Sequence, residues 1–420
     1  MTIIEHGYGY ARRLLLLLVL MIKFSCLLML AESKKKKKYT SIGGQAVIEG
    51  VMMRSPHSFV IALRLVNNKI RLRRDQWFGL GNKFKYFKKP FLRGILAVIE
   101  SMVNGIVSLN YSANVAMQEE LEREQEGQQQ KTNTTQTQAT PQQSTEQQSM
   151  DQQSTEKKAK EKAEAKEKLS EKIGWATFFT MIVSLIFGVG LFIFLPHWLT
   201  ILLGFSKVES FEFHLVDGVV KGLIFILYVV LIGLLPDIKK IFQYHGAEHK
   251  AIATFEAGED LIVENTRKFS TLHPRCGTSF IFFLIFISII FFSAFFAGLP
   301  IASGLPFWSR HVVIVFLKIF LMLPVAGLAY EVIKFAGAHP HNGWCKLISA
   351  PGLLLQRITT NAPNDNQLDV ALASLKTALL LEEKYDLKGA GKKVLSVEEV
   401  EIDNSKIIES SNLKLHDFLD

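Results

Sequence analysis

Long apolar segments dominate the pattern of hydrophobic and polar positions along the chain. Four of them run for about 20 residues each, the length that crosses the hydrocarbon layer of a bilayer: roughly 175–195, 215–235, 278–299 and 312–330. A mean hydropathy of +0.20 and 31 phenylalanines agree with this pattern. The predicted fold class is an α-helical integral membrane protein with about four transmembrane helices and a small N-terminal β-containing cytoplasmic region.

The chain before the first span divides into four parts. Residues 1–38 form an apolar extension ending in a lysine run; cleavage, an added anchor and an over-extended start all stay open. Residues 39–90 predict a soluble β-containing region, with a hairpin whose strands lie near 59–66 and 70–73. Over 91–117 we expect an interfacial or membrane-packed helix, with a fifth crossing as the alternative. Residues 118–172 predict a disordered Gln-rich insertion and a charged helical stalk.

The second half of the chain alternates spans with polar segments. The first two predicted spans (TM1 and TM2) are assigned to 173–236, and the last two (TM3 and TM4) to 277–331. Between them, 237–276 is predicted to be a cytoplasmic loop that contains a helix near 237–257. The cytoplasmic tail, 332–420, starts with His339, His341 and Cys345. It then contains an apolar piece too short to span, at 347–355, and an amphipathic helix over 367–383 that Asp365 is expected to cap. The acidic C-terminal residues are predicted to be loose.

Charge sets the expected orientation and partners. Lysines and arginines flank the N-terminal side of the first span and fill the loop after the second, so the N-terminal region, the central loop and the tail are predicted to be cytoplasmic. The alternating Arg71, Arg73 and Arg74 favour a solvated basic face, with lipid head groups next, and no nucleic acid is expected. Three cysteines predict no disulfide framework.

The main chemical signal lies in 244–250, where two histidines stand four residues apart with a carboxylate beside the second. On a helix, His245 and His249 share one face, so both imidazoles are able to bind one metal ion. The order His-x-x-Glu-His is that of the inverted zincins, in which the glutamate activates a metal-bound water. The sequence therefore predicts a divalent metal, with zinc as the first candidate, and Glu248 as general base.

The third metal ligand stays open between Glu331, His273 and Cys276, because catalytic zinc usually has three protein ligands. Glu256 shares the helix face but lies about 10 Å from His249 along the axis, so it is not expected to bind the same ion. A Cys276 ligand would favour a structural or thiolate-tuned site over a hydrolytic one. The alternative to metal binding is that these residues cap helices and bind lipid head groups.

Four strings stand in order along the chain: 42–54; 244–250; 263–265 with 272–279; and 350–353 with Gln356 and 359–360. Together they resemble the YqhQ-like family of bacterial membrane proteins, described as predicted metal-dependent enzymes without an established reaction. The resemblance implies a multi-pass protein of the inner (cytoplasmic) membrane. It adds weight to His245, Glu248, His249, His273 and Cys276. The other motif positions are Gly43, Gly44, Gln45, Glu49, Arg54, Glu256 and Arg275.

Two functions follow from these observations. The first is a metal-dependent hydrolase acting on a membrane protein or lipid at the cytoplasmic membrane surface. The second is a non-catalytic membrane scaffold or assembly factor with a structural His/Cys cluster. Within the spans, Asp217 and Lys221 are placed to pair across one helical turn and Lys318 lies in the fourth span, but no relay of carboxylates points to a proton-coupled carrier.

Overall fold

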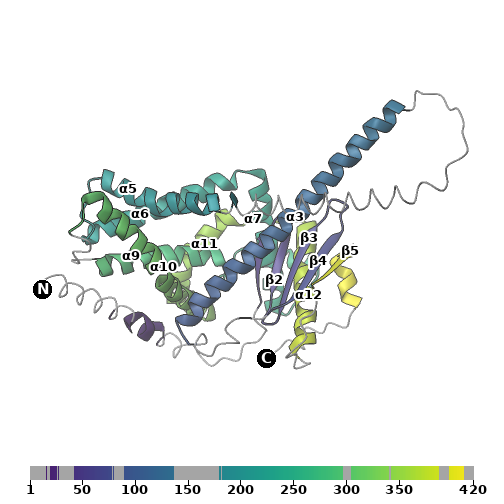
Figure 1. Cartoon of the computed structure of the whole chain (residues 1–420). Helices are drawn as coiled ribbons and strands as arrows, with labels where there is room; N and C mark the ends of the chain where they lie inside the picture. The colour runs from purple at the N-terminus through teal and green to yellow at the C-terminus, as the bar shows by residue number, and fades with distance from the viewer. Residues whose placement is uncertain are drawn as a thin grey trace, which may run out of the picture.

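The computed structural model describes residues 42–77, 79, 89–136, 179–180, 182–296, 304–339, 342–386 and 397–410, with residues 16, 19–25 and 27 near the N-terminus. The lysine run of the predicted 1–38 extension and most of the predicted 118–172 insertion lie outside these residues. Figure 1 shows a bundle of apolar helices beside a sheet with its own flanking helices, and one long helix that runs past both. The site described below lies where these parts meet.

Five antiparallel strands form the sheet in the order β1-β2-β3-β4-β5. Their bounds are β1 Gly43–Val47, β2 Gly50–Arg54, β3 Ser58–Arg64, β4 Ile70–Gln76 and β5 Glu398–Ile402. The predicted hairpin is present as β3 and β4, with Arg64 opposite Ile70. The glycine-rich string that starts the soluble region forms the further hairpin β1–β2, which the sequence analysis does not predict.

The C-terminal segment is not wholly loose, because β5 completes the sheet beside β4. Arg71 lies opposite Glu401 and forms an ion pair of 2.8 Å, and Arg74 pairs with Glu398 at 2.7 Å. Exposed pairs of this kind add little stability, yet opposite charges directly across two strands favour one register. The basic face of β4 therefore meets the chain's own acidic strand.

Each face of the sheet packs on helices. On one face lie α7 (Pro236–Ala257) and α12 (Asp365–Asp386), which share a core with alternate residues of β2, β3 and β4. The predicted apolar stripe of α12 is buried there: Leu368, Leu372, Leu375 and Leu379. On the other face, Val47, Met52 and Ile61 pack on Val115 of α3 (Leu92–Gln136). Successive side chains of a strand therefore belong to two different hydrophobic cores, one on each face of the sheet.

The cap of α12 differs from the prediction. Asn364, and not Asp365, accepts a hydrogen bond from the backbone N–H of Gln367 at 2.9 Å, and Gln367 Oε1 accepts one from the N–H of Asn364 at 3.0 Å. This reciprocal pair is a capping box moved one residue towards the N-terminus. Asp365 instead forms an ion pair with Arg267.

Five helices, and not four, are long and apolar enough to cross a membrane among the described residues. They are Leu92–Arg123, Ile182–Leu202, Phe211–Gly233, Gly277–Phe296 and Phe307–Gly337. The first belongs to α3; the second contains η2 (Gly190–Phe194) and α5 (Leu195–Leu202); the others belong to α6 (Phe211–Gly233), α9 (Gly277–Phe296) and α10 (Phe307–Ala338). The count of about four is therefore not exact, because the helix expected near 91–117 also qualifies.

Helix α3 contacts both parts of the molecule. Near its start, a Cβ on Gly94 would lie 2.7 Å from the carbonyl oxygen of Gly327, so glycine allows a close crossing with α10. About five turns further on, Ser112 Oγ accepts a hydrogen bond from the N–H of Ile48 at the β1–β2 turn. The helix then continues to Gln136, well into the segment predicted to be disordered.

Charged side chains are buried inside the bundle. Lys318 Nζ of α10 lies 2.8 Å from Asp217 Oδ2, and Lys221 Nζ lies 3.7 Å from the same oxygen. The i,i+4 pair expected within α6 is thus present, but Lys318 is the nearer partner. All three side chains are nearly inaccessible to solvent.

Helix α11 (Gly343–Thr359) includes the short apolar segment and continues beyond it at both ends. Trp344, Leu347 and Leu354 are exposed, whereas Leu355 and Gln356 are buried. This division into an apolar exposed face and a packed face is typical of a helix that lies along a membrane surface. The remaining short helices are α8 (Val263–Thr266) and η3 (Ser405–Ser410).

Candidate metal centre

Helix α7 carries the two histidines and the glutamate of the motif. It begins at Pro236, whose fixed φ suits the first turn, and ends before Gly258, whose φ of 73° favours glycine. The predicted helix and its C-terminal signal are therefore confirmed. The rings of His245 and His249 lie 4.4 Å apart between centroids, on one face of the helix.

Cys276 reaches the same place from the turn before α9. Its Sγ lies 3.1 Å from His245 Nε2, and one nitrogen of each histidine and this sulfur all lie within 4.8 Å of one another. A tetrahedral zinc ion with bonds of about 2.0–2.3 Å separates its ligand atoms by about 3.5 Å. The three side chains, called the His/Cys cluster below, therefore match a zinc site in kind and nearly in spacing.

Backbone carbonyls fix the other nitrogen of each imidazole. His245 Nδ1 donates to the carbonyl of Thr359 at 2.9 Å, and His249 Nδ1 donates to the carbonyl of Thr271. Because a carbonyl only accepts, each Nδ1 carries the proton and each Nε2 presents a lone pair. Metal-binding histidines almost always show this arrangement, since the outer hydrogen bond sets the tautomer and the direction of the ring.

Burial favours the neutral form of His249 in the cluster, which is the form that binds a metal ion. It lowers the pKa of His249, the largest effect there, and so favours the neutral imidazole that binds metals. The sulfur of Cys276 accepts a hydrogen bond from the N–H of Thr278 at 3.4 Å, which helps to fix its position. Two imidazole nitrogens and one thiolate form a donor set that suits zinc.

Glu248 is buried beside the cluster. Its Oε2 lies 4.0 Å from His245 Nε2. Burial raises the pKa of Glu248, while the charges of His245 and His273 and a hydrogen bond from the N–H of Gly44 oppose the rise. A carboxylate with a raised pKa next to a possible metal position is suited to accept and return a proton.

Strand β1 approaches Glu248 closely at Gly44. A Cβ there would lie 2.6 Å from Glu248 Cγ and 2.8 Å from Oε1, so only glycine leaves room for the carboxylate. The neighbouring Gly43 differs, because a Cβ there would meet no atom within 4 Å. Packing therefore requires glycine at position 44 and not at position 43.

We expect Gly44→Ala to displace Glu248 and to lower the free energy of unfolding by about 1–3 kcal/mol, the usual effect of overpacking a buried site. Gly43→Ala is the matched control and should leave the melting temperature nearly unchanged, since its methyl group meets open space. Thermal unfolding of the two purified variants measures both effects. Equal melting temperatures would show that Glu248 is not held against Gly44.

His273 does not join the cluster, although its ring lies 5.7 Å from that of His249. Its Nε2 lies 3.5 Å from Glu256 Oε2, and Arg275 also forms an ion pair with Glu256. Burial lowers the pKa of His273. Glu256 therefore contacts the segment that precedes Cys276 and, as expected from its distance along α7, is absent from the group that meets metal spacing among the described residues.

Glu331, the other candidate ligand, has different partners. Arg93 donates to it through Nε at 2.7 Å and through Nη2 at 2.5 Å, and the backbone N–H of Phe91 donates at 3.1 Å. The carboxylate is fully buried in this arrangement. It binds the start of α3 to α10 and is not part of the His/Cys cluster.

The chain is similar to one family of known proteins. The family model described as a protein of unknown function (DUF1385) matches residues 89–381, which include the whole cluster. The chain belongs to the DUF1385 family. The uncharacterized protein YqhQ of Bacillus subtilis (strain 168) is 31% identical over 347 residues, which cover 81% of this chain and 92% of that protein. No solved structure matches the chain. The predicted YqhQ-like membership is confirmed.

A residue of this DUF1385 chain that sequence reasoning left without a role is Gln356. Its Oε1 accepts from the N–H of His273, and its Nε2 donates to the carbonyl of His273 and to Ser279 Oγ, with distances of 2.8, 2.8 and 2.9 Å. It thereby fixes the turn that presents Cys276. The only sequence signal was its place in the last motif string beside Thr359, whose carbonyl holds His245.

The first motif string of this DUF1385 chain contacts two other helices. Glu49 Oε1 accepts from Lys240 Nζ of α7 at 2.8 Å, so the β1–β2 turn contacts the helix that carries the two histidines. Arg54 pairs with Glu100 of α3 at 3.3 Å and not with Glu49. Gln45 lies against Gly105 of α3, where a Cβ would be 2.8 Å from its amide nitrogen.

The residues after α10 do not add ligands within the described part of the chain. His339 Nδ1 donates to the carbonyl of Phe335 at 3.0 Å. Cys345 is a buried free thiol. Neither belongs to the group of three that meets metal spacing, and His341 lies outside the described residues.

Proposed function

We propose that this DUF1385 chain is a multi-pass protein of the cytoplasmic membrane whose His/Cys cluster binds zinc and hydrolyses a membrane-associated substrate at the cytoplasmic surface. The observation that carries the proposal is the convergence of one ring nitrogen of His245, one of His249 and Cys276 Sγ, with both Nδ1 atoms held by carbonyls. Three protein ligands leave one position of a tetrahedral ion for water, as in catalytic zinc sites.

Packing supports four crossings, with α3 on the membrane surface or along the sheet. β1 contacts α7, and in sequence the two are separated by α3, the helix Ile182–Leu202 and α6. Because they are in contact, β1 and α7 lie on one side of the membrane, and an even number of crossings separates them. If the helix Ile182–Leu202 and α6 both cross, α3 does not. Sheet, α7 and α12 then share one side, which the positive-inside rule makes cytoplasmic.

In the proposed chemistry, the zinc ion and the protein side chains have different roles. A zinc ion would supply a Lewis acid and lower the pKa of a bound water towards neutrality. Glu248 would accept the proton, since it lies next to His245 and burial raises its pKa towards the range where proton transfer in both directions is easy. The carbonyls of Thr271 and Thr359 would hold both imidazoles in the binding tautomer.

The second candidate function is a non-catalytic membrane scaffold or assembly factor with a structural zinc cluster. Cys276 favours it, because thiolates are the usual ligands of structural zinc. A structural site is closed by four protein ligands, whereas the group at metal spacing among the described residues has three. This difference in ligand number is what the experiment must measure.

Cobalt(II) in place of zinc distinguishes the two candidates without knowledge of a substrate. Bound to detergent-purified protein, it reports its own coordination through its visible spectrum. Addition of azide is expected to change the spectrum, because a site with three protein ligands keeps an exchangeable position. An unchanged spectrum at saturating azide would show a closed site and exclude the hydrolytic function.

Glu248→Gln separates the base from the ligands. We expect this variant to bind cobalt within about tenfold of the wild-type affinity and to keep the response to azide, because Glu248 acts beside the ion in the proposal. Competition with a chromophoric chelator measures the affinity. A loss greater than about 100-fold, as for removal of a ligand, would make Glu248 the fourth ligand and support the structural alternative.

A further inference from the structure

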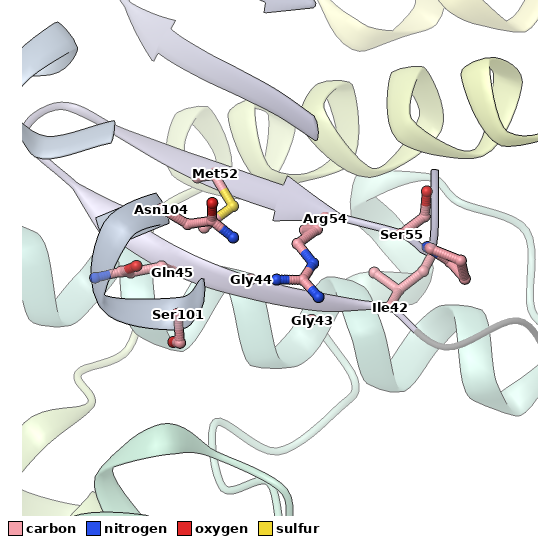
Figure 2. Close-up of a pocket in the computed structure, with 10 residues that line it drawn as sticks. Ile42, Gly43, Gly44, Gln45, Met52, Arg54, Ser55, Ser101 and Asn104 are labelled. Carbon is pink, nitrogen blue, oxygen red and sulfur yellow. The ribbon is translucent and has the colours of Figure 1, made fainter. Parts of the chain in front are cut away.

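A cavity of about 370 Å³ lies between the β1–β2 hairpin and α3 (Figure 2). Gly43, Gly44 and Gln45 of β1 form one wall, and Ser101 and Asn104 of α3 form another. The volume is in the range of small-ligand sites, and the walls combine polar groups with open backbone. Gly44 separates this cavity from Glu248, so the cavity adjoins the proposed metal site without being part of it.

Gly43 has no structural reason to be glycine. A Cβ on it would meet nothing within 4 Å, and its φ is not positive, so neither packing nor backbone conformation excludes a side chain. Glycine in a strand often marks a place where a ligand approaches the backbone closely. Since Gly43 lines the cavity, the open space above it is available to such a ligand.

Among the described residues that line this cavity, Arg54 alone has a formal charge. Figure 2 shows its side chain extending from β2 towards the strand at Gly44. Its Nη2 lies 3.3 Å from Glu100 Oε2, and its guanidinium lies 4.6 Å from the ring centroid of Trp77. These contacts hold the plane of the guanidinium, which has five N–H donors and matches the oxygens of phosphate or carboxylate.

The cavity lies next to the apolar bundle. Helix α3, which forms one wall of the cavity, packs at Gly94 against Gly327 and Tyr330 of the candidate span Phe307–Gly337. The side of α3 that faces away from Ser101 and Asn104 is apolar and exposed, with Met102, Val103 and Ile106. A cationic cavity on one side of α3 and an uncovered apolar face on its other side offer complementary surfaces to the two ends of an anionic amphiphile that lies across the helix.

We infer that this cavity binds the phosphate-bearing head group of an anionic membrane lipid, with Arg54 as the anion-binding residue and the acyl chains along the exposed face of α3. The inference rests on the proposed function, because it names the class of membrane-associated molecule that the chain binds, at a cavity on the far side of β1 from Glu248. Binding itself requires no metal, so the two proposals fail in different experiments.

Native mass spectrometry of the full chain in detergent, after metal removal with a chelator, tests the inference with four probes: a short-chain phosphatidic acid, a short-chain phosphatidylcholine, glycerol 3-phosphate and inorganic phosphate. We expect phosphatidic acid to bind at least about tenfold more tightly than the other three. Arg54→Gln should weaken this binding roughly 10- to 100-fold, the effect of losing hydrogen bonds to a charged group. The matched control is Arg74→Gln, because both arginines are on the sheet and both side chains are 31% exposed.

Gly43→Leu is the second variant, chosen because a Cβ at this position meets no atom within 4 Å. Its side chain should fill the cavity and weaken phosphatidic acid binding to the same extent, while the melting temperature stays near the wild-type value. Equal binding to wild type, Arg54→Gln and Gly43→Leu would overturn the inference. Inorganic phosphate binding as tightly as the lipid would also overturn it, because the site would then be one for free phosphate. Equal binding of phosphatidylcholine would show apolar attachment alone.

Discussion

Replacement of His249 by Ala is expected to weaken zinc binding roughly 100- to 1000-fold. Structural zinc in four-ligand sites is bound by about 10–16 kcal/mol, so one ligand contributes roughly 3–4 kcal/mol. His249 offers a ligand nitrogen within 4.8 Å of the other two donor atoms, and no other imidazole of the described residues takes that place. Competition with a chromophoric zinc chelator in detergent gives both dissociation constants.

His273→Ala is the control for this variant. Its ring is buried near that of His249, and it belongs to the same set of motif strings, but its Nε2 faces Glu256. We expect its zinc affinity to stay within about tenfold of the wild-type value, as for a residue outside the ligand set. Equal losses in both variants would mean that the ligands are not those of the His/Cys cluster.

Asp217→Asn is expected to destabilise the helical bundle by about 3–5 kcal/mol, because it leaves the ammonium of Lys318 buried without a counter-charge. Lys221, 3.7 Å from the same carboxylate, would add like-charge repulsion. The free energy of unfolding in mixed micelles, or the melting temperature in one detergent, measures the loss.

Two further variants test whether the loss of stability comes from the buried ion pair. Glu212→Gln, an exposed acidic residue at the start of the same helix, should change stability by less than about 0.5 kcal/mol. Lys318→Met in the Asp217→Asn background should restore part of the loss, because it removes the unpaired charge. A double variant less stable than Asp217→Asn would contradict the account of this ion pair.

Local patterns predicted most of the elements that position the site. The spans follow from apolar runs whose length matches the bilayer, and α7 follows from helical spacing with a glycine at its end. The sheet was only half predicted. β5 pairs with β4 across more than 320 residues of sequence, and neither strand contains information about such a distant partner beyond opposite charges.

The candidate site, like the sheet, was predicted only in part. His245 and His249 share a face because helical geometry is local, so the sequence brings them together. The choice of Cys276 over His273 and Glu331 depends on how the turn before α9 and the start of α3 meet other helices, and such contacts leave no periodic pattern. The arginine that holds Glu331 lies 238 residues away along the chain.

The carbonyls that orient the imidazoles could not be predicted at all. Any residue supplies a carbonyl, so Thr271 and Thr359 are recognisable only after the backbone is placed. Gln356 was marked by a motif string, yet its bonds to the backbone of His273 depend on α11 packing against α9. These residues matter because they decide which nitrogen of each histidine is free.

The most direct test of the central claim is the zinc content of the full chain, purified in detergent and dialysed against trace zinc, measured by elemental analysis beside Cys276→Ser. We predict about one zinc per wild-type chain and a marked loss in the variant, with both proteins equally folded by circular dichroism. A folded wild-type protein that takes up no zinc, or that keeps the same amount after His245, His249 and Cys276 are all replaced, would contradict the account.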